Sequence, residues 1–161
     1  MSKASFPDGF SCLHCDAFVS ISPRISGVRN RNHCPYCLWS RHVDWRSPGD
    51  RLSSCKGAMH PIGLTLKTTR NKYAPCPAGE VMVVHRCTVC GAFSVNRIAA
   101  DDGVNPLMDV FRSSLALPDQ IRNTLCDLGI CLLERADADI VSHRLFGSLQ
   151  PARIGRFSAG E

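Results

Sequence analysis

The chain has 161 residues, a formal net charge of +5 and a hydrophobic fraction of 44%, values typical of one compact globular domain or two small ones. It shows no apolar signal segment near Met1 and no stretch long enough to span a membrane, which argues against a secreted or membrane protein. We therefore expect a reducing, cytoplasmic setting, in which metal binding explains the ten cysteines better than disulfides do.

The first predicted feature is a metal site built from two Cys-x2-Cys pairs. The pairs are separated by 18 residues and supply four ligands: Cys12, Cys15, Cys34 and Cys37. This spacing is typical of a tetrahedral four-thiolate zinc site, which is structural because no coordination position is open. Residues 11–60 contain many turn formers and one short strand-like run at 18–22, so zinc would supply folding energy on the order of 10 kcal/mol that apolar burial cannot. His14 and His33 adjoin ligand cysteines and are interpreted as neighbours of the site.

A β-meander is predicted over residues 60–100, and a second metal site with it. Its strand-like runs cover residues 62–66, 81–86 and 92–96, and the last two flank a third Cys-x2-Cys pair, as in a zinc ribbon.

The ligands of this second site are the pair Cys87 and Cys90, with Cys55 as the natural third. The fourth could be His85, Cys76 or His60. His85 is favoured because it lies two residues before Cys87 on the same face of the incoming strand. If no side chain filled this position, a water would, and the site would be open to catalysis.

The C-terminal part is predicted to begin with helices. Asn105 as N-cap and Pro106 at the first helical position favour a helix start, and an apolar stripe at helical spacing follows. Pro118 ends or restarts the helix, and a second stripe ends near Gly129. Residues 130–146 fit either two strands or more helix.

The predicted fold class is α+β, with a small zinc-stabilised, β-rich, tandem zinc-ribbon-like module and a short helical or mixed αβ C-terminal region. The corresponding ranges are residues 10–104 for the two-zinc module, 105–149 for the extension and 150–161 for a flexible tail. Cys126 and Cys131 lie outside both metal sites and are interpreted as small core residues.

The positive charge is concentrated in the first half of the chain. Residues 1–73 carry 11 Lys and Arg against 4 Asp and Glu, whereas residues 74–161 carry 8 against 10. Arginines interleaved with Tyr36, Trp39 and Trp45 are typical of single-stranded RNA binding, although a solvated face that offsets the anionic thiolates explains them equally well. The predicted RNA-contacting residues are Arg29, Arg31, Arg41, Arg46, Lys67, Arg70 and Lys72.

The remaining polar residues predict no catalytic set, because nothing in the spacing brings His42, Asp44 and the pair Asp101-Asp102 together. Most of them are expected to brace the two metal sites. The expected ion pairs join Asp44 or Asp50 to Arg31, Arg51 or Arg97.

Several separate motifs, in order, carry a family resemblance. Residues 31–35 read RNHCP, and the other motifs are CLWSRHVD at 37–44, PGDR at 48–51, CKGAMHP at 55–61, HRCTVCG at 85–91 and NRIAADD at 96–102. Together they closely resemble the bacterial RNHCP-domain family over about residues 10–115. The resemblance points to His85 as the fourth ligand of the second site. It implies metal binding through seven cysteines: Cys12, Cys15, Cys34, Cys37, Cys55, Cys87 and Cys90. It implies no particular activity.

Three functions follow as hypotheses. The first is a module with two structural zinc ions that binds RNA or a ribonucleoprotein. The second is a protein-interaction adaptor whose helices over residues 105–128 dock on a partner. The third is a zinc-dependent hydrolase or nuclease with an open second site, although the chain has no HExxH motif. A four-thiolate site also accepts iron in place of zinc.

Overall fold

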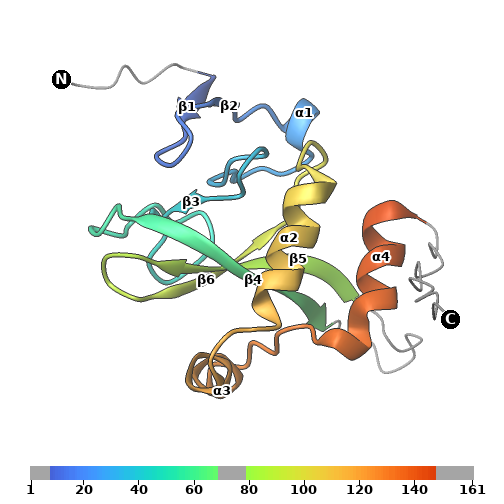
Figure 1. The fold of residues 1–161 in the computed structure, drawn as a ribbon. Helices are drawn as coiled ribbons and strands as arrows, with labels where there is room; N and C mark the ends of the chain where they lie inside the picture. The colour runs from blue at the N-terminus through green and yellow to red at the C-terminus, as the bar shows by residue number, and fades with distance from the viewer. Residues whose placement is uncertain (1–7, 69–78, 148–161) are drawn as a thin grey trace, which may run out of the picture.

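A computed structural model describes residues 8–68 and 79–147 and confirms the mixed α+β fold, with a β-rich N-terminal part followed by helices (Figure 1). The strands are β1 (Gly9–Ser11), β2 (Phe18–Ser20), β3 (Ser40–Arg41), β4 (Ala58–Thr68), β5 (Gly79–Cys87) and β6 (Phe93–Arg97). The helices are α1 (Pro23–Ser26), α2 (Val104–Ser114), α3 (Asp119–Asp127) and α4 (Ala138–Phe146), and the 3-10 turn η1 (Arg135–Asp137) precedes α4. Among the described residues, no helix is long and apolar enough to cross a membrane.

The main sheet is the predicted meander. Strands β3, β4, β5 and β6 lie side by side in chain order, and every neighbouring pair is antiparallel. Because β5 lies between β4 and β6, all of residues 81–85 are buried, which explains their continuous apolar character in the sequence. The strands β1 and β2 form a separate hairpin.

The hydrophobic core lies between this sheet and α2, which crosses the sheet between the β1–β2 hairpin and α3 (Figure 1). Leu107 and Phe111 of α2 pack in one cluster with Leu64 of β4 and Val83 of β5. Leu38 joins the same cluster from the loop that carries Cys34 and Cys37. The core therefore fixes that loop against the sheet.

The C-terminal helices differ from the prediction in one detail, and they decide between two alternatives that the sequence left open. Helix α2 begins at Val104 with Gly103 as its N-cap, so Asn105 lies inside the first turn and caps nothing. Residues 130–146 form η1 and α4 rather than two strands, with one isolated bridge between Leu132 and Thr65 of β4.

Cys126 and Cys131 are both exposed, so their interpretation as core residues is wrong. The buried apolar side chain at the end of α3 is Leu125 instead.

Candidate metal centres

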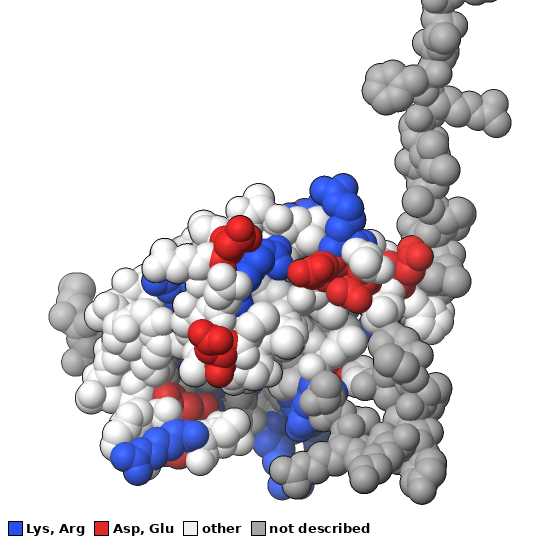
Figure 2. All heavy atoms as spheres, turned by 90° about the horizontal axis from the view of Figure 1, so that it is seen from below, with Lys and Arg blue, Asp and Glu red and all other residues white. Residues whose placement is uncertain are grey.

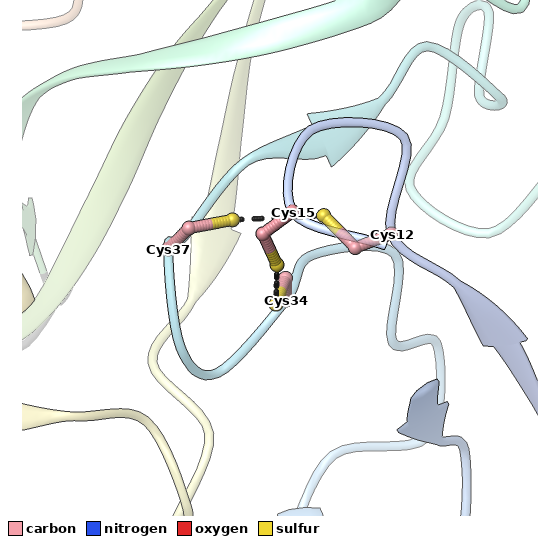
Figure 3. Close-up of side chains that lie close together, drawn as sticks. All are labelled: Cys12, Cys15, Cys34 and Cys37. Carbon is pink, nitrogen blue, oxygen red and sulfur yellow. Dashed lines mark hydrogen bonds between the residues drawn. The ribbon is translucent and has the colours of Figure 1, made fainter. Parts of the chain in front are cut away.

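The first cluster consists of four cysteine side chains that point toward one another from two loops (Figure 3). Cys12 and Cys15 lie between β1 and β2, and Cys34 and Cys37 lie before β3. The Sγ atoms of Cys12 and Cys37 are 3.5 Å apart, and those of Cys15 and Cys34 are 3.6 Å apart. A zinc ion with Zn–S bonds of about 2.3 Å holds tetrahedral sulfurs about 3.8 Å apart, so this donor set fits zinc.

All three Cys-x2-Cys pairs adopt the same tight turn. The backbone N–H groups of Asp16, Leu38 and Gly91 donate to the carbonyl oxygen four residues earlier, at 3.1, 2.9 and 3.1 Å. The same three residues have φ values of 59°, 61° and 76°. Such a left-handed conformation costs a residue like leucine on the order of 1–2 kcal/mol. Because Leu38 is fully buried, the packing around it holds the turn in this conformation.

Burial also affects how the thiols of the first cluster ionise. It raises the pKa of Cys34 and of Cys37, against the effect of the backbone N–H groups that face their sulfurs. A metal ion that binds the four cysteines as thiolates therefore has to displace the protons of Cys34 and Cys37.

The second cluster consists of His42, Cys55, Cys87 and Cys90, whose ligand atoms all lie within 4.8 Å of one another. The Sγ atoms of Cys55 and Cys87 are 3.7 Å apart, and Cys90 Sγ lies 3.2 Å from His42 Nδ1. Three thiolates and one imidazole are a frequent donor set for structural zinc. The cluster therefore also fits zinc and supplies four protein ligands.

His42 reaches this cluster because the pairing of β3 with β4 continues past the end of β3. The N–H of His42 donates to Gly57 O at 2.8 Å, and the N–H of Lys56 donates to His42 O at 3.1 Å. Glycine at position 57 leaves room for this approach, because a Cβ there would lie 2.7 Å from Val89 and 3.1 Å from Cys87 Sγ. The backbone thus places His42 beside Cys55.

The prediction that His85 is the fourth ligand is wrong in this structure. His85 is fully buried on β5, where its Nε2 donates to Leu38 O at 2.7 Å and its Nδ1 accepts from Asn96 Nδ2 at 3.0 Å. Both ring nitrogens are thereby occupied, and burial lowers the pKa of His85 to about 3. His85 links the sheet to the loop of Cys37 as a neutral imidazole.

The other candidates for this position also lie elsewhere. His60 is exposed, with its ring 4.9 Å from that of Trp39, and Cys76 lies outside the described residues. His14 and His33 stay outside both clusters. The ring of His14 stacks on that of Trp39, with the ring centres 4.2 Å apart, and the backbone N–H of His14 donates to Cys12 Sγ with an N···S distance of 3.4 Å.

The two histidines can be separated by zinc content. His42→Ala is expected to lower the zinc bound per chain from about two ions to about one, because three ligands of one site remain. His85→Ala is the matched control and is expected to keep both ions, although the loss of a buried hydrogen-bonded ring lowers stability. Zinc in dialysed protein would be measured by plasma mass spectrometry. Loss of an ion from His85→Ala with retention in His42→Ala would contradict the assignment.

A network of ion pairs and hydrogen bonds among the buried side chains of Arg31, His33 and Asp102, with the partly exposed Asp101 at its edge, braces the first cluster. We call it the buried ion-pair network. Arg31 donates to both oxygens of Asp101 at 2.7 Å, to Asp102 Oδ1 at 3.2 Å and to His33 O at 3.1 Å. His33 Nε2 donates to Asp102 Oδ2 at 2.7 Å, and that oxygen also accepts the N–H of Ala99. The side chains of Arg31 and Asp102 are completely buried.

The prediction that Arg31 and Arg97 pair with Asp44 or Asp50 is wrong. Arg31 pairs with Asp101 and Asp102, and Arg97 pairs with Glu80 at 2.9 Å. Of the expected pairs, that of Asp44 with Arg51 is present, at 3.6 Å. Asp50 accepts backbone N–H groups of its own loop, from Leu52 and from residues 45–47, and these lower its pKa.

The predicted RNA-contacting residues divide into three groups. Arg31 is buried in its ion-pair network and does not reach a surface ligand, so its prediction as a contact is wrong. Arg70 and Lys72 lie outside the described residues. Four side chains are exposed: Arg29, Arg41, Arg46 and Lys67.

Comparison with known proteins gives one match. A sequence model of the RNHCP domain matches residues 7–108, which include both clusters and the buried ion-pair network. No match was found among curated proteins or among solved structures.

Proposed function

Because the chain belongs to the RNHCP-domain family and brings together two clusters that fit zinc, we propose that it is a zinc-stabilised module that binds single-stranded RNA, free or in a ribonucleoprotein. The observation that supports this proposal is the position of the four exposed cations Arg29, Arg41, Arg46 and Lys67.

These cations line two adjoining hollows in the surface. Arg29 and Lys67 line a hollow of about 440 Å³, together with Arg97, and Arg41 and Arg46 line another of about 200 Å³. The two hollows adjoin because they share the lining residues Asn32, Asp44, Pro48, Val95 and Asn96. A chain of phosphates lying along both hollows would meet cations and amides, and also the carboxylate of Asp44, which is paired with Arg51.

Aromatic and apolar side chains beside these cations suit nucleobases. Trp45 is 61% exposed, and the Arg46 guanidinium lies 4.2 Å from the centre of its ring, which makes a flat cationic platform for stacking. Arg41 also borders a third hollow of about 260 Å³, whose lining includes Phe10 and Trp39. A base turned out of its stack would find an apolar site there.

The alternative to RNA binding is that the exposed cations belong to a solvated face of mixed charge. On the side of the molecule where α3 lies, acidic and basic groups do alternate without a single-sign region (Figure 2). Two exposed cations that line neither hollow, Arg112 on α2 and Arg135 in η1, provide a matched control for charge reversal.

The test is a filter-binding titration of single-stranded RNA at several salt concentrations. If the four exposed cations each contact a phosphate, affinity should fall about 50-fold between about 50 and 200 mM salt, since each contact contributes about 0.7 to the logarithmic slope. The double variant Arg29→Glu/Lys67→Glu should lose about half of that slope, and Arg112→Glu/Arg135→Glu should keep it. Absence of binding at low salt, or binding without salt dependence, would refute the proposal.

One observation favours a protein-interaction adaptor as a second candidate. A groove of about 880 Å³ runs between the sheet and the helices, with Ile62, Val110, Leu117 and Ile121 among its lining. An adaptor would bind no RNA in the titration above and would co-purify with one protein. The hydrolase hypothesis, in contrast, requires an open second site, and His42 lies where it could supply a fourth ligand there.

A further inference from the structure

Cys126 and Cys131 lie on either side of the turn that ends α3. Both thiols are exposed, and neither belongs to a metal cluster. The turn is closed by two backbone hydrogen bonds, from Gly129 N to Cys126 O at 2.9 Å and from Ile130 N to Leu125 O at 2.8 Å. Gly129 has a φ of +77°, the left-handed conformation that reverses the chain after a helix. The turn therefore brings residues five apart in the sequence back toward each other.

The segment after this turn is fixed independently to the sheet. Thr65 Oγ1 donates to Cys131 O at 2.6 Å, and Leu133 N donates to Leu64 O at 2.8 Å. Cys126 is fixed by α3, whose Leu125 is fully buried. Both cysteines are thus anchored through their backbones while their side chains remain accessible.

The Cys131 side chain lies beside the Cys126 thiol, close enough to affect how that thiol ionises. Desolvation raises the pKa of Cys126, and a hydrogen bond with the Cys131 side chain raises it further. The neighbouring charges of Asp127 and Glu134 act in the same direction. Since thiolate is the attacking species, this environment slows exchange at neutral pH without preventing it.

We propose that Cys126 and Cys131 form a reversible intramolecular disulfide by exchange with a small-molecule disulfide such as glutathione disulfide. One protein thiolate attacks a glutathione sulfur, forms a mixed disulfide and releases one glutathione. The second protein thiolate then attacks the protein sulfur of the mixed disulfide and releases the other glutathione. Two electrons pass from the protein dithiol to glutathione disulfide, and both thiol protons end on the two glutathione molecules.

The product would link the end of α3 to the segment fixed on β4. Ile121 of α3 lines the groove between the helices and the sheet, so the disulfide would restrain one wall of that groove. The proposal does not depend on RNA binding, because none of the cations proposed to contact RNA lies in this segment.

Trypsin gives a direct readout for the full-length, zinc-loaded protein. Cleavage after Arg122 and Arg135 releases the peptide of residues 123–135, which contains Cys126 and Cys131 and no other cysteine. After equilibration with glutathione buffers and alkylation of free thiols, the oxidised peptide is expected to be two hydrogens lighter and unalkylated. The variant Cys126→Ser should give only alkylated or glutathionylated Cys131.

A synthetic peptide of residues 123–135 tests whether the fold brings the thiols together. The intact protein is expected to form the disulfide with an equilibrium constant at least about tenfold larger than that of the peptide. This corresponds to a reduction potential about 30 mV lower for the protein disulfide. An equal constant in peptide and protein would overturn the proposal, as would a protein peptide that is alkylated or glutathionylated at both cysteines at every buffer ratio. A disulfide to a third cysteine would overturn it as well.

Discussion

Removal of the metal ions with a strong chelator is expected to unfold the N-terminal two-thirds of the chain. Apart from the first cluster's own cysteines, the core around it has only Val19 fully buried, with Phe10, Ala17 and Trp39 partly buried against it. Such a core cannot offset the conformational entropy of ordering the surrounding loops. A structural zinc site contributes about 10 kcal/mol or more, which is comparable with the whole stability of a domain, about 5–15 kcal/mol.

The measurement is circular dichroism during titration with a chelator, with released zinc determined in parallel. Two equivalents should leave, the β-sheet signal should collapse with them, and restoring zinc under reducing conditions should recover it. A double variant, Cys126→Ser/Cys131→Ser, is the control for thiol chemistry outside the clusters and should behave like the unaltered chain. Full retention of secondary structure after complete zinc release would contradict this account.

Arg31→Met is expected to destabilise the zinc-loaded protein by about 3–5 kcal/mol, because it leaves the buried carboxylate of Asp102 without its cationic partner. Asp102 is completely buried, and after the substitution it would keep the N–H of Ala99 and the ring of His33 as donors. Arg31→Lys should recover only part of the loss, since a single ammonium cannot reproduce the contacts to Asp101, Asp102 and His33 O together.

Arg97→Met is the matched control for this substitution. Arg97 also forms an ion pair, but its side chain is 59% exposed and that of Glu80 is 40% exposed, so the loss should be below about 1 kcal/mol. Both variants would be compared by urea unfolding at one fixed excess of zinc, because bound metal shifts apparent stability. Equal, small losses in the two variants would show that the buried ion-pair network adds little to stability.

The first cluster was predictable because its ligands come in two local pairs whose spacing alone indicates the site. The meander was predictable for a similar reason, since continuous apolar runs report burial of β5 directly. The fourth ligand of the second cluster was not. His42 adjoins no cysteine in the sequence, and only the pairing of β3 with β4 brings it beside Cys55.

His85 was misassigned because its spacing from Cys87 was compatible with ligation, while its actual partners are distant in sequence. Leu38 and Asn96 come from a loop and from a neighbouring strand, and each satisfies one ring nitrogen. The partners of Arg31 were missed for the same reason. Asp101 and Asp102 come after the last strand of the sheet in the sequence, about 70 residues from Arg31. A sequence pattern reports local geometry well, whereas these contacts depend on how the sheet and α2 close over the first loops.

The buried ion-pair network also affects how the chain can finish folding while it is being synthesised. The last ligand of the first cluster is residue 37, but Asp101 follows Arg31 by 70 positions. At about 5–20 residues per second, these 70 residues take about 4–14 s to appear. During that interval Arg31 lacks both of its carboxylate partners, so we expect the first loops to stay open to solvent around an already complete cysteine cluster. We therefore expect this region to close only after Asp101 and Asp102, near the C-terminal end of the RNHCP domain, have been synthesised.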